Sequence, residues 1–233
     1  MKHILIISNI PAPYRSGQFA CLRSRFPEWK VSVLYTGKIE ADRVWETDEP
    51  EGETYFLQSK VLSVKGGEVG GTATRYVHLP KGLLKMLDTL KPDAVIAGEY
   101  NLSAVQALFW AKAHQIPFVN MTDGTLHSES YIGFVQKLTR RLIIGGADSF
   151  LASGSRAKEK LLHWGAEEER IAIAYLTVDT TPFQKLVRQP ENGRILYVGR
   201  ISRKKGLDLL VQALAKMKVP CALRVAGNDV GGE

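Results

Sequence analysis

The chain has 233 residues, of which 45% are apolar and 24% are charged. This composition excludes a chain that is disordered throughout, and no apolar run approaches the roughly 18 residues that a membrane span needs. Thirty-one Lys and Arg against 24 Asp and Glu give a net charge of +7, which favours anionic partners such as phosphates, lipid headgroups or nucleic acid but equally serves solubility.

The first elements form a strand–helix–strand pattern. "HILIIS" (3–8) and "VSVLYT" (31–36) are short apolar runs, and "GQFACLRSRF" between them places apolar residues at helical spacing. Pro11 and Pro13 follow the first run too closely for a signal peptide. Cys21 and Cys221 lie in apolar sequence surroundings, so we expect both to be reduced and buried.

The segment 39–78 is less regular. It contains four glycines in "GGEVGGTATRY", but they lack the Gly-x-Gly-x-x-Gly spacing and do not join a strand to a helix. We interpret the glycine-rich segment as a flexible loop, with a substrate lid as the alternative.

Helices and strands then alternate as far as residue 176. Helical stripes occur in "GLLKMLDTL", "LSAVQALFWAKAHQI", "FVQKLTRRLIIGGA" and "GSRAKEKLLHWGA", and apolar strands in "AVIA", "PFVNMT", "SFLAS" and "RIAIAYL". Ser153 or Ser155 is expected to cap the fourth of these helices. The succession predicts an α/β fold, a Rossmann-like doubly wound parallel sheet.

A second unit is expected after a linker. We predict a first domain over 1–180, a polar linker over 181–193 and the beginning of a second Rossmann-like domain over 194–233. The second segment predicts only a strand, a helix and a strand, and a unit of that size cannot bury its own faces. We therefore expect a second domain that is incomplete.

Cations gather at the turn between that strand and helix. Arg200, Arg203, Lys204 and Lys205 fall within six positions of "VGRISRKKGL". A helix N-terminus disfavours cations, by about 0.3–1 kcal/mol each, unless an anion is bound there. A diphosphate would supply that anion, and a solvated basic loop is the alternative.

The same stretch, "LYVGRISRKKGLDLLVQALAKM", resembles the second-domain signature of retaining nucleotide-sugar glycosyltransferases of the GT-B fold, the family-four or group 1 type. The resemblance implies transfer of a sugar from a nucleotide diphosphate to an acceptor hydroxyl, with the anomeric configuration kept. It assigns Arg200 and Lys205 to the donor diphosphate, whereas Arg203 and Lys204 match variable positions.

The resemblance extends into the first domain. "SNIPAPYRSGQF" is similar to the family's first strand-to-helix loop, where Gly17 would let the backbone approach the donor phosphate and Tyr14 and Arg15 would face the acceptor. In "PFVNMTDGTLHSES", Asp123 stands where many members have a histidine near the transferred sugar. This makes Asp123 the catalytic candidate, although Asp-Gly is also a strong turn signal.

Two further residues belong to the acceptor side. Glu99 ends a strand at the same sheet edge, and His127 follows Asp123 by four positions. A helix-start hydrogen bond is the alternative role for Glu99, and an ordinary loop position is the alternative for His127.

No Asp-x-Asp metal motif is present, so we expect no metal and no cofactor beyond the nucleotide-sugar co-substrate. The expected partners are that donor and a glycan, glycolipid or small-molecule acceptor, with peripheral contact to a membrane surface allowed and no nucleic acid. The expected location is cytoplasmic.

The paired glutamates and the base pocket of the family lie downstream of the signature. The chain is therefore expected to be a truncated enzyme, inactive by itself. Two alternatives remain open: a nucleotide-sugar epimerase or phosphorylase on the same scaffold, and a non-catalytic domain that binds an acceptor or another partner.

Overall fold

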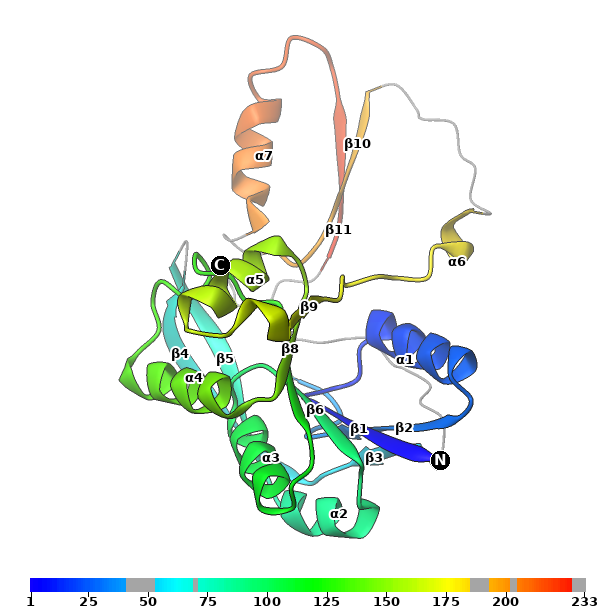
Figure 1. The fold of residues 1–233 in the computed structure, drawn as a ribbon. Coiled ribbons are helices and arrows are strands. Elements are labelled where there is room, and N and C mark those ends of the chain that lie inside the picture. Colours follow the sequence, from blue (N-terminus) through cyan, green and yellow to red (C-terminus); the bar gives the residue numbers. More distant parts are fainter. Residues whose placement is uncertain (41–52, 69–70, 185–192, 202–204, 228–233) are drawn as a thin grey trace. The chain divides into compact units, whose positions relative to one another are not determined.

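The computed structural model describes residues 1–40, 53–68, 71–184, 193–201 and 205–227. The chain divides into two compact units, the first comprising Met1–Gly66 with Thr74–Asp179 and the second Gly67–Ala73 with Thr180–Glu233. Figure 1 colours the elements along the sequence, from blue at the N-terminus to red at the C-terminus.

The first unit is built on a seven-stranded sheet of order β3-β2-β1-β6-β7-β8-β9. Every neighbouring pair in it is parallel. The strands are β1 (Lys2–Ser8), β2 (Trp29–Tyr35), β3 (Thr54–Phe56), β6 (Ala94–Gly98), β7 (Phe118–Thr122), β8 (Ser149–Ala152) and β9 (Ile171–Ile173). The predicted α/β fold with a parallel sheet is thereby confirmed.

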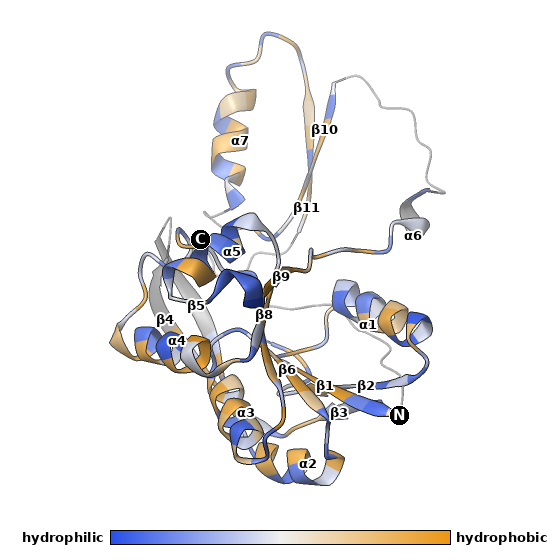
Figure 2. Ribbon diagram, viewed as in Figure 1, coloured by the Kyte–Doolittle hydropathy of each residue, from blue (hydrophilic) through white to orange (hydrophobic). Residues whose placement is uncertain are grey.

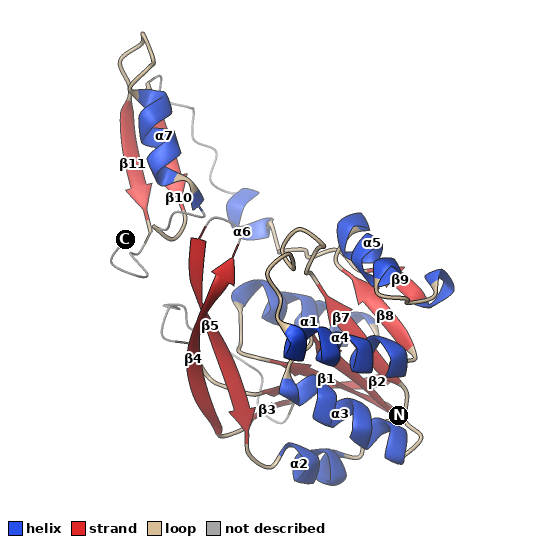
Figure 3. Cartoon of the chain, turned by 90° about the vertical axis from the view of Figure 1, so that its left-hand side faces the viewer, coloured by secondary structure: helices blue, strands red, loops and turns tan. Residues whose placement is uncertain are grey.

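Helices cover both faces of this sheet (Figure 3). They are α1 (Pro13–Arg25), α2 (Leu83–Leu90), α3 (Leu102–Ala113), α4 (Phe134–Gly146) and α5 (Ser155–His163), with the short 3₁₀ helix η1 (Glu168–Arg170) before β9. Side chains alternate between the faces along a strand. Ile6 of β1 accordingly packs in one core with Phe19 of α1. Leu5 and Ile7 pack in the larger core with residues of α2 to α5.

The glycine-rich segment forms strands, so the predicted loop is wrong. β4 (Ser59–Glu68) and β5 (Gly71–Pro80) pair in a separate two-stranded sheet, and β3 joins the main sheet. Glycine is a weak strand former, but the valines, threonines and aromatic residues around it favour extended backbone. Residues 41–52 of the less regular segment and residues 69–70 of its glycine-rich part lie outside the described residues.

Two local expectations also fail. Cys21 is exposed rather than buried, because Phe19 occupies the inward face of α1 and a residue two positions later points elsewhere. The N-cap of α5 is Gly154, which makes no side-chain hydrogen bond, so neither Ser153 nor Ser155 caps that helix as predicted. Cys221 is partly buried and unpaired.

The second unit contains β10 (Arg194–Val198) and β11 (Ala222–Ala226), which pair in parallel, with α7 (Leu207–Leu214) between them and the short α6 (Thr181–Gln184) before them. None of its described residues is buried. Apolar side chains on β10 and α7 are exposed, as at Val198 and Leu209. The unit thus does not cover its own faces.

Candidate functional site: a pocket at the carboxyl edge of the first sheet

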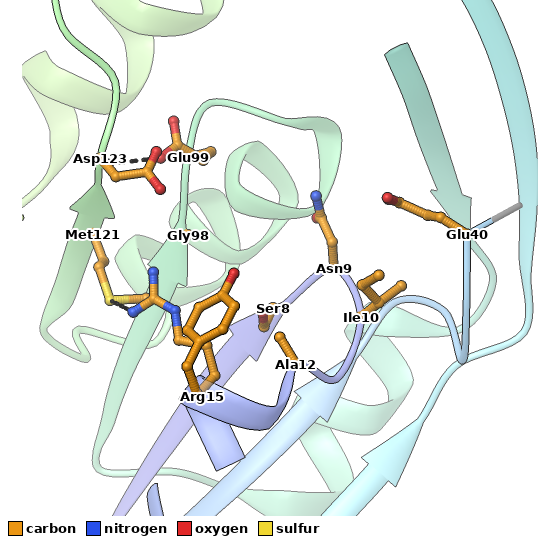
Figure 4. A pocket seen from close by; sticks show the side chains of 11 residues that line it. Ser8, Asn9, Ile10, Ala12, Arg15, Glu40, Gly98, Glu99, Met121 and Asp123 are labelled. Carbon is orange, nitrogen blue, oxygen red and sulfur yellow. Dashed lines mark hydrogen bonds between the residues drawn. The ribbon is translucent and has the colours of Figure 1, made fainter. Parts of the chain in front are cut away.

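The carboxyl ends of β1, β6 and β7 border an open pocket of about 190 Å³ in the first unit. Ligands of open parallel sheets bind beyond the carboxyl ends of the strands, where the connecting loops meet. The side chains that give this pocket its chemistry come from these strand ends, from the start of α1 and from the segment after β2: Asn9, Tyr14, Arg15, Glu40, Glu99, Met121 and Asp123. Figure 4 shows Arg15 reaching toward Met121 and Glu99 beside Asp123.

Arg15 is positioned by the start of α1. Pro13 occupies the first turn of that helix, where a missing N–H costs nothing and the ring fixes a helical φ. The guanidinium of Arg15 lies 3.4 Å from the sulfur of Met121, and Arg15 carries no described ion pair with an acidic side chain. Its charge is therefore available at the pocket for an anionic or hydroxylated ligand.

Glu99 lies in a strained backbone conformation. It directly follows β6 with φ of +60°, a region that residues other than glycine seldom occupy and that costs about 1–3 kcal/mol. Two hydrogen bonds hold it there, because the Nδ2 of buried Asn120 donates to the carbonyls of Ala97, at 3.2 Å, and of Glu99, at 2.8 Å. Strain that the surroundings impose in this way is common at functional sites.

The carboxylate of Glu99 joins the ends of β6 and β7. It accepts the backbone N–H of Asp123 at 3.0 Å and the hydroxyl of Thr122 at 3.3 Å. Burial, followed by the nearby charge of Asp123, raises the pKa of Glu99 from 4.5 to about 7, and the Lys160 ammonium only partly offsets this rise. Glu99 can therefore donate or accept a proton near neutral pH, while exposed Asp123 stands beside it.

The buried ammonium of Lys160 is connected to Glu99 through the Thr122 hydroxyl. Lys160 is fully buried, and its ammonium donates to the Thr122 hydroxyl at 2.6 Å and lies 3.4 Å from the Glu129 carboxylate. Since the Thr122 hydroxyl also bonds Glu99, Lys160, Thr122 and Glu99 form one connected chain. Burial lowers the pKa of Lys160, although the charges of Glu99 and Glu129 favour its charged form.

Arg140 completes the cluster on the α4 side. Its guanidinium makes two hydrogen bonds to the Glu129 carboxylate, at 2.9 and 3.0 Å, the bidentate geometry that Arg favours. The Lys160 ammonium and the Arg140 guanidinium both lie over the ring of Tyr100, at 4.6 and 4.8 Å. A Cβ added at Gly124 would stand 2.9 Å from the Lys160 ammonium, so a larger residue there would force that ammonium to shift.

The structure brings four predicted residues together at the pocket: Tyr14, Arg15, Glu99 and Asp123. Gly17 lies inside α1, where an added Cβ would meet nothing within 4 Å, and His127 is exposed in the loop after β7. Neither of these two lines the pocket. Sequence reasoning missed Thr122, Glu129, Arg140 and Lys160. Only the two helical residues carry a signal, because Lys160 shares a helix face with buried Ala157 and Leu161, and Arg140 with buried Ile143 and Ile144.

The two predicted phosphate-binding cations, Arg200 and Lys205, lie in the second unit. Arg200 follows Gly199 beyond the end of β10, and its carbonyl accepts the Tyr197 hydroxyl at 2.9 Å. Lys205 is exposed and precedes Gly206, the left-handed N-cap of α7. The predicted variable positions Arg203 and Lys204 lie outside the described residues.

Two features are absent from the part of the chain that the structure describes, a cluster of metal ligands and a membrane-spanning helix. No three His, Cys, Asp or Glu side chains there gather as a metal site. None of the described helices has both the length and the apolar character that crossing a membrane requires.

The sequence matches no family model. It is 33% identical over 87 residues to the D-inositol 3-phosphate glycosyltransferase of Pseudarthrobacter chlorophenolicus, a match covering 34% of this chain and 21% of that protein. The matched part is thus a small fraction of that enzyme.

Solved structures resemble this chain over nearly its whole length. Anabaena HepE in complex with UDP gives a TM-score of 0.63 at 15% identity, covering 100% of this chain and 62% of that one. The lipopolysaccharide outer core galactosyltransferase WaaB gives 0.58 at 17% identity, covering 98% and 61%. The UDP-N-acetylglucosamine 2-epimerase of Rickettsia bellii gives 0.51 at 16%, covering 97% and 62%. The chain has a Rossmann-like fold of the GT-B type and spans about three fifths of these solved chains.

Proposed function

We propose that this protein is a glycosyltransferase that moves a sugar from a nucleotide diphosphate to an acceptor hydroxyl. The observation that carries the proposal is the Glu99–Asp123 carboxyl pair at a pocket on the carboxyl edge of the sheet. Carboxylates bind sugar hydroxyls, and an acid with a pKa near 7 suits proton transfer at neutral pH. The partial identity with a glycosyltransferase and the GT-B type of fold support it.

In this proposal Arg200 and Lys205 hold the donor diphosphate. Breaking the bond to the sugar leaves negative charge on that diphosphate, and fixed cations near the charge lower the barrier. Arginine offers a planar fork and lysine a compact point charge, so we propose that these two residues, without a metal, stabilise the leaving group. Retention of the anomeric configuration belongs to the same proposal.

The acceptor belongs to the first unit in this account. Arg15 and Tyr14 border the pocket with Glu99 and Asp123, and an acceptor hydroxyl placed among them could pass its proton to a neighbouring carboxylate. Asp123 is the residue that we propose contacts the transferred sugar. The two free cysteines suit a reducing compartment, and we propose the cytoplasm.

A nucleotide-sugar epimerase is the second candidate. The likeness in fold to a UDP-N-acetylglucosamine 2-epimerase supports it, and the raised pKa of Glu99 serves this reaction as well as the transferase, because removing and returning a proton at a sugar carbon needs a group that is partly protonated at neutral pH.

Binding of UDP tests the donor site. We expect backbone amide signals around Arg200 and Lys205 to shift in NMR spectra of the protein as UDP is added. Each of Arg200→Ala and Lys205→Ala should weaken binding about tenfold, a loss of about 1.4 kcal/mol, while the matched control Lys216→Ala, on the exposed lysine beyond α7, should bind as wild type. Equal affinities in all four proteins would contradict the donor site.

Product analysis separates the two candidates. UDP-glucose and UDP-N-acetylglucosamine are each incubated in heavy water with a version of the protein that has a complete second domain. Sugar released from UDP or joined to an added glycan supports the transferase, whereas deuterium at the second carbon of an intact nucleotide-sugar supports the epimerase.

A further inference from the structure

Helix α4 presents an apolar stripe that no other described segment of the first unit covers. Phe134 and Val135 are 80% and 71% exposed, and Leu138 and Leu142 are 46% and 41% exposed. Tyr131, just before the helix, is 59% exposed as well. Isolated exposed apolar residues are common, but several neighbouring large ones mark an interaction surface.

The stripe occupies one side of the helix. At about 100° per residue, its four helical members fall within an arc of about 100°. The buried residues Arg140, Ile143 and Ile144 fall on the side that packs against the first unit. Figure 2 shows orange, apolar positions beside blue, polar ones along α4. The helix is therefore apolar on its inner face and again on part of its outer face.

Cations border this outer stripe. Lys137 and Arg141 are exposed and lie next to Phe134 and Leu138 around the helix axis. The sequence of α4, FVQKLTRRLIIGG, contains no Asp or Glu. Lys and Arg have long apolar stems, so their charged ends can reach outward while the stems lie along apolar material.

We infer that the outer face of α4 docks on an anionic lipid surface, with Phe134, Val135, Leu138 and Leu142 in the acyl boundary and Lys137 and Arg141 at the headgroups. A helix of this pattern lies in the membrane interface, where burial of apolar area and attraction to anionic lipid act together. This inference goes beyond the proposed function and does not rest on it.

Charge selects lipid over a second copy of the chain. In a two-fold dimer the same patch faces itself, which would bring the Lys137–Arg141 border of one helix near that of the other with no acidic residue in either helix. An anionic bilayer instead supplies negative charge all along that border.

Vesicle flotation tests the inference with the whole chain. Vesicles of phosphatidylcholine alone are compared with vesicles that also contain phosphatidylglycerol, at low and at high salt. We expect the wild type to bind the anionic vesicles, and we expect high salt to weaken that binding. The double variant Phe134→Ser with Leu138→Ser should weaken binding about tenfold or more, and so should Lys137→Gln with Arg141→Gln. The control, Leu84→Ser with Lys85→Gln on the exposed side of α2, should bind as wild type.

Circular dichroism and thermal melting of each variant show whether the fold is intact. The inference is overturned if the wild type ignores anionic vesicles, or if folded α4 variants bind them as well as the α2 control does. A concentration-dependent dimer in light scattering that Phe134→Ser with Leu138→Ser dissociates would overturn it too, because a second copy would then cover the stripe.

Discussion

Carboxylates lie at both edges of the seven-stranded sheet, and the two edges use them differently. At the amino edge, Asp93 precedes β6 and accepts the N–H of His3 at 2.6 Å, and Asp148 precedes β8 and accepts the N–H of Phe118 at 2.8 Å. In return, the N–H of Asp93 donates to the carbonyl of His3, and the N–H of Asp148 donates to the carbonyl of Phe118. These carboxylates complete the ladder between neighbouring strands.

Ionisation separates the two edges further. Burial opposes the charge of Asp148, but hydrogen bonds from Lys112 and Phe118 outweigh it and hold the pKa of Asp148 below its usual value. Burial and Asp123 instead raise the pKa of Glu99 to about 7. The amino edge thus keeps Asp148 charged and stabilising, whereas the carboxyl edge keeps a costly carboxylate in Glu99, as functional sites often do.

The largest expected difference in stability is between substitutions of two lysines, Lys160 at the carboxyl edge and Lys112 at the amino edge. Lys160→Met should destabilise the protein by about 4 kcal/mol, because it removes the buried ammonium that bonds Thr122 and balances the charges of Glu129 and Glu99. Lys112→Met removes only an exposed ion pair with Asp148 and should cost under about 1 kcal/mol. Urea unfolding of both variants measures the difference, and equal losses would contradict the distinction.

The pH dependence of stability tests Glu99. Its folded pKa is raised, so the folded state binds the proton more tightly, and Glu99 makes stability fall as pH rises from 4.5 to about 7. The full loss is about 3 kcal/mol. Glu99→Gln should flatten this slope and be more stable than wild type above pH 7 by urea unfolding. An unchanged slope would show that Glu99 titrates normally.

Gly124→Ala should disturb the cluster at the carboxyl edge more gently. The new Cβ would lie 2.9 Å from the Lys160 ammonium and 3.2 Å from the Glu129 carboxylate, and we expect a loss of about 1–2 kcal/mol. Gly145→Ala in α4 is the matched control, since an added Cβ there meets nothing within 4 Å. It should be neutral or stabilise the protein by up to about 1 kcal/mol.

The smallest effect is expected at the amino edge. The folded pKa of Asp148 is lowered, so its stabilisation is present above its ordinary pKa of 3.8 and is lost as pH falls below that value. Asp148→Asn should remove this acid-side loss and leave UDP binding unchanged. Melting temperatures of both proteins, measured across the acid pH range, test the first expectation. If the variant loses as much stability at acid pH as the wild type does, a group other than Asp148 causes that loss.

The alternating strands and helices of the first unit could be predicted from the sequence, because buried parallel strands are nearly continuous apolar runs. Glu99 and Asp123 could be found for the same reason, since each directly follows such a run. The hairpin β4–β5 could not, because its glycines suggest a loop, whereas pairing between the two strands decides its structure.

The buried part of the site was also beyond sequence reasoning. Lys160 resembles any surface lysine of a helix, and only its spacing from Ala157 and Leu161 places it on the inner face. Glu129 and Arg140 lie 11 positions apart and meet only in the folded chain. Contacts between segments far apart in sequence leave no mark on either segment.

Measuring the pKa of Glu99 tests most directly the claim that the carboxyl edge of the sheet is suited to proton transfer. Carbon-13 NMR of the Glu99 side-chain carboxyl should give a midpoint of about 7 in the wild type. Asp123→Asn should lower the midpoint, and Lys160→Met should raise it. A midpoint near the ordinary 4.5, insensitive to both substitutions, would contradict the account.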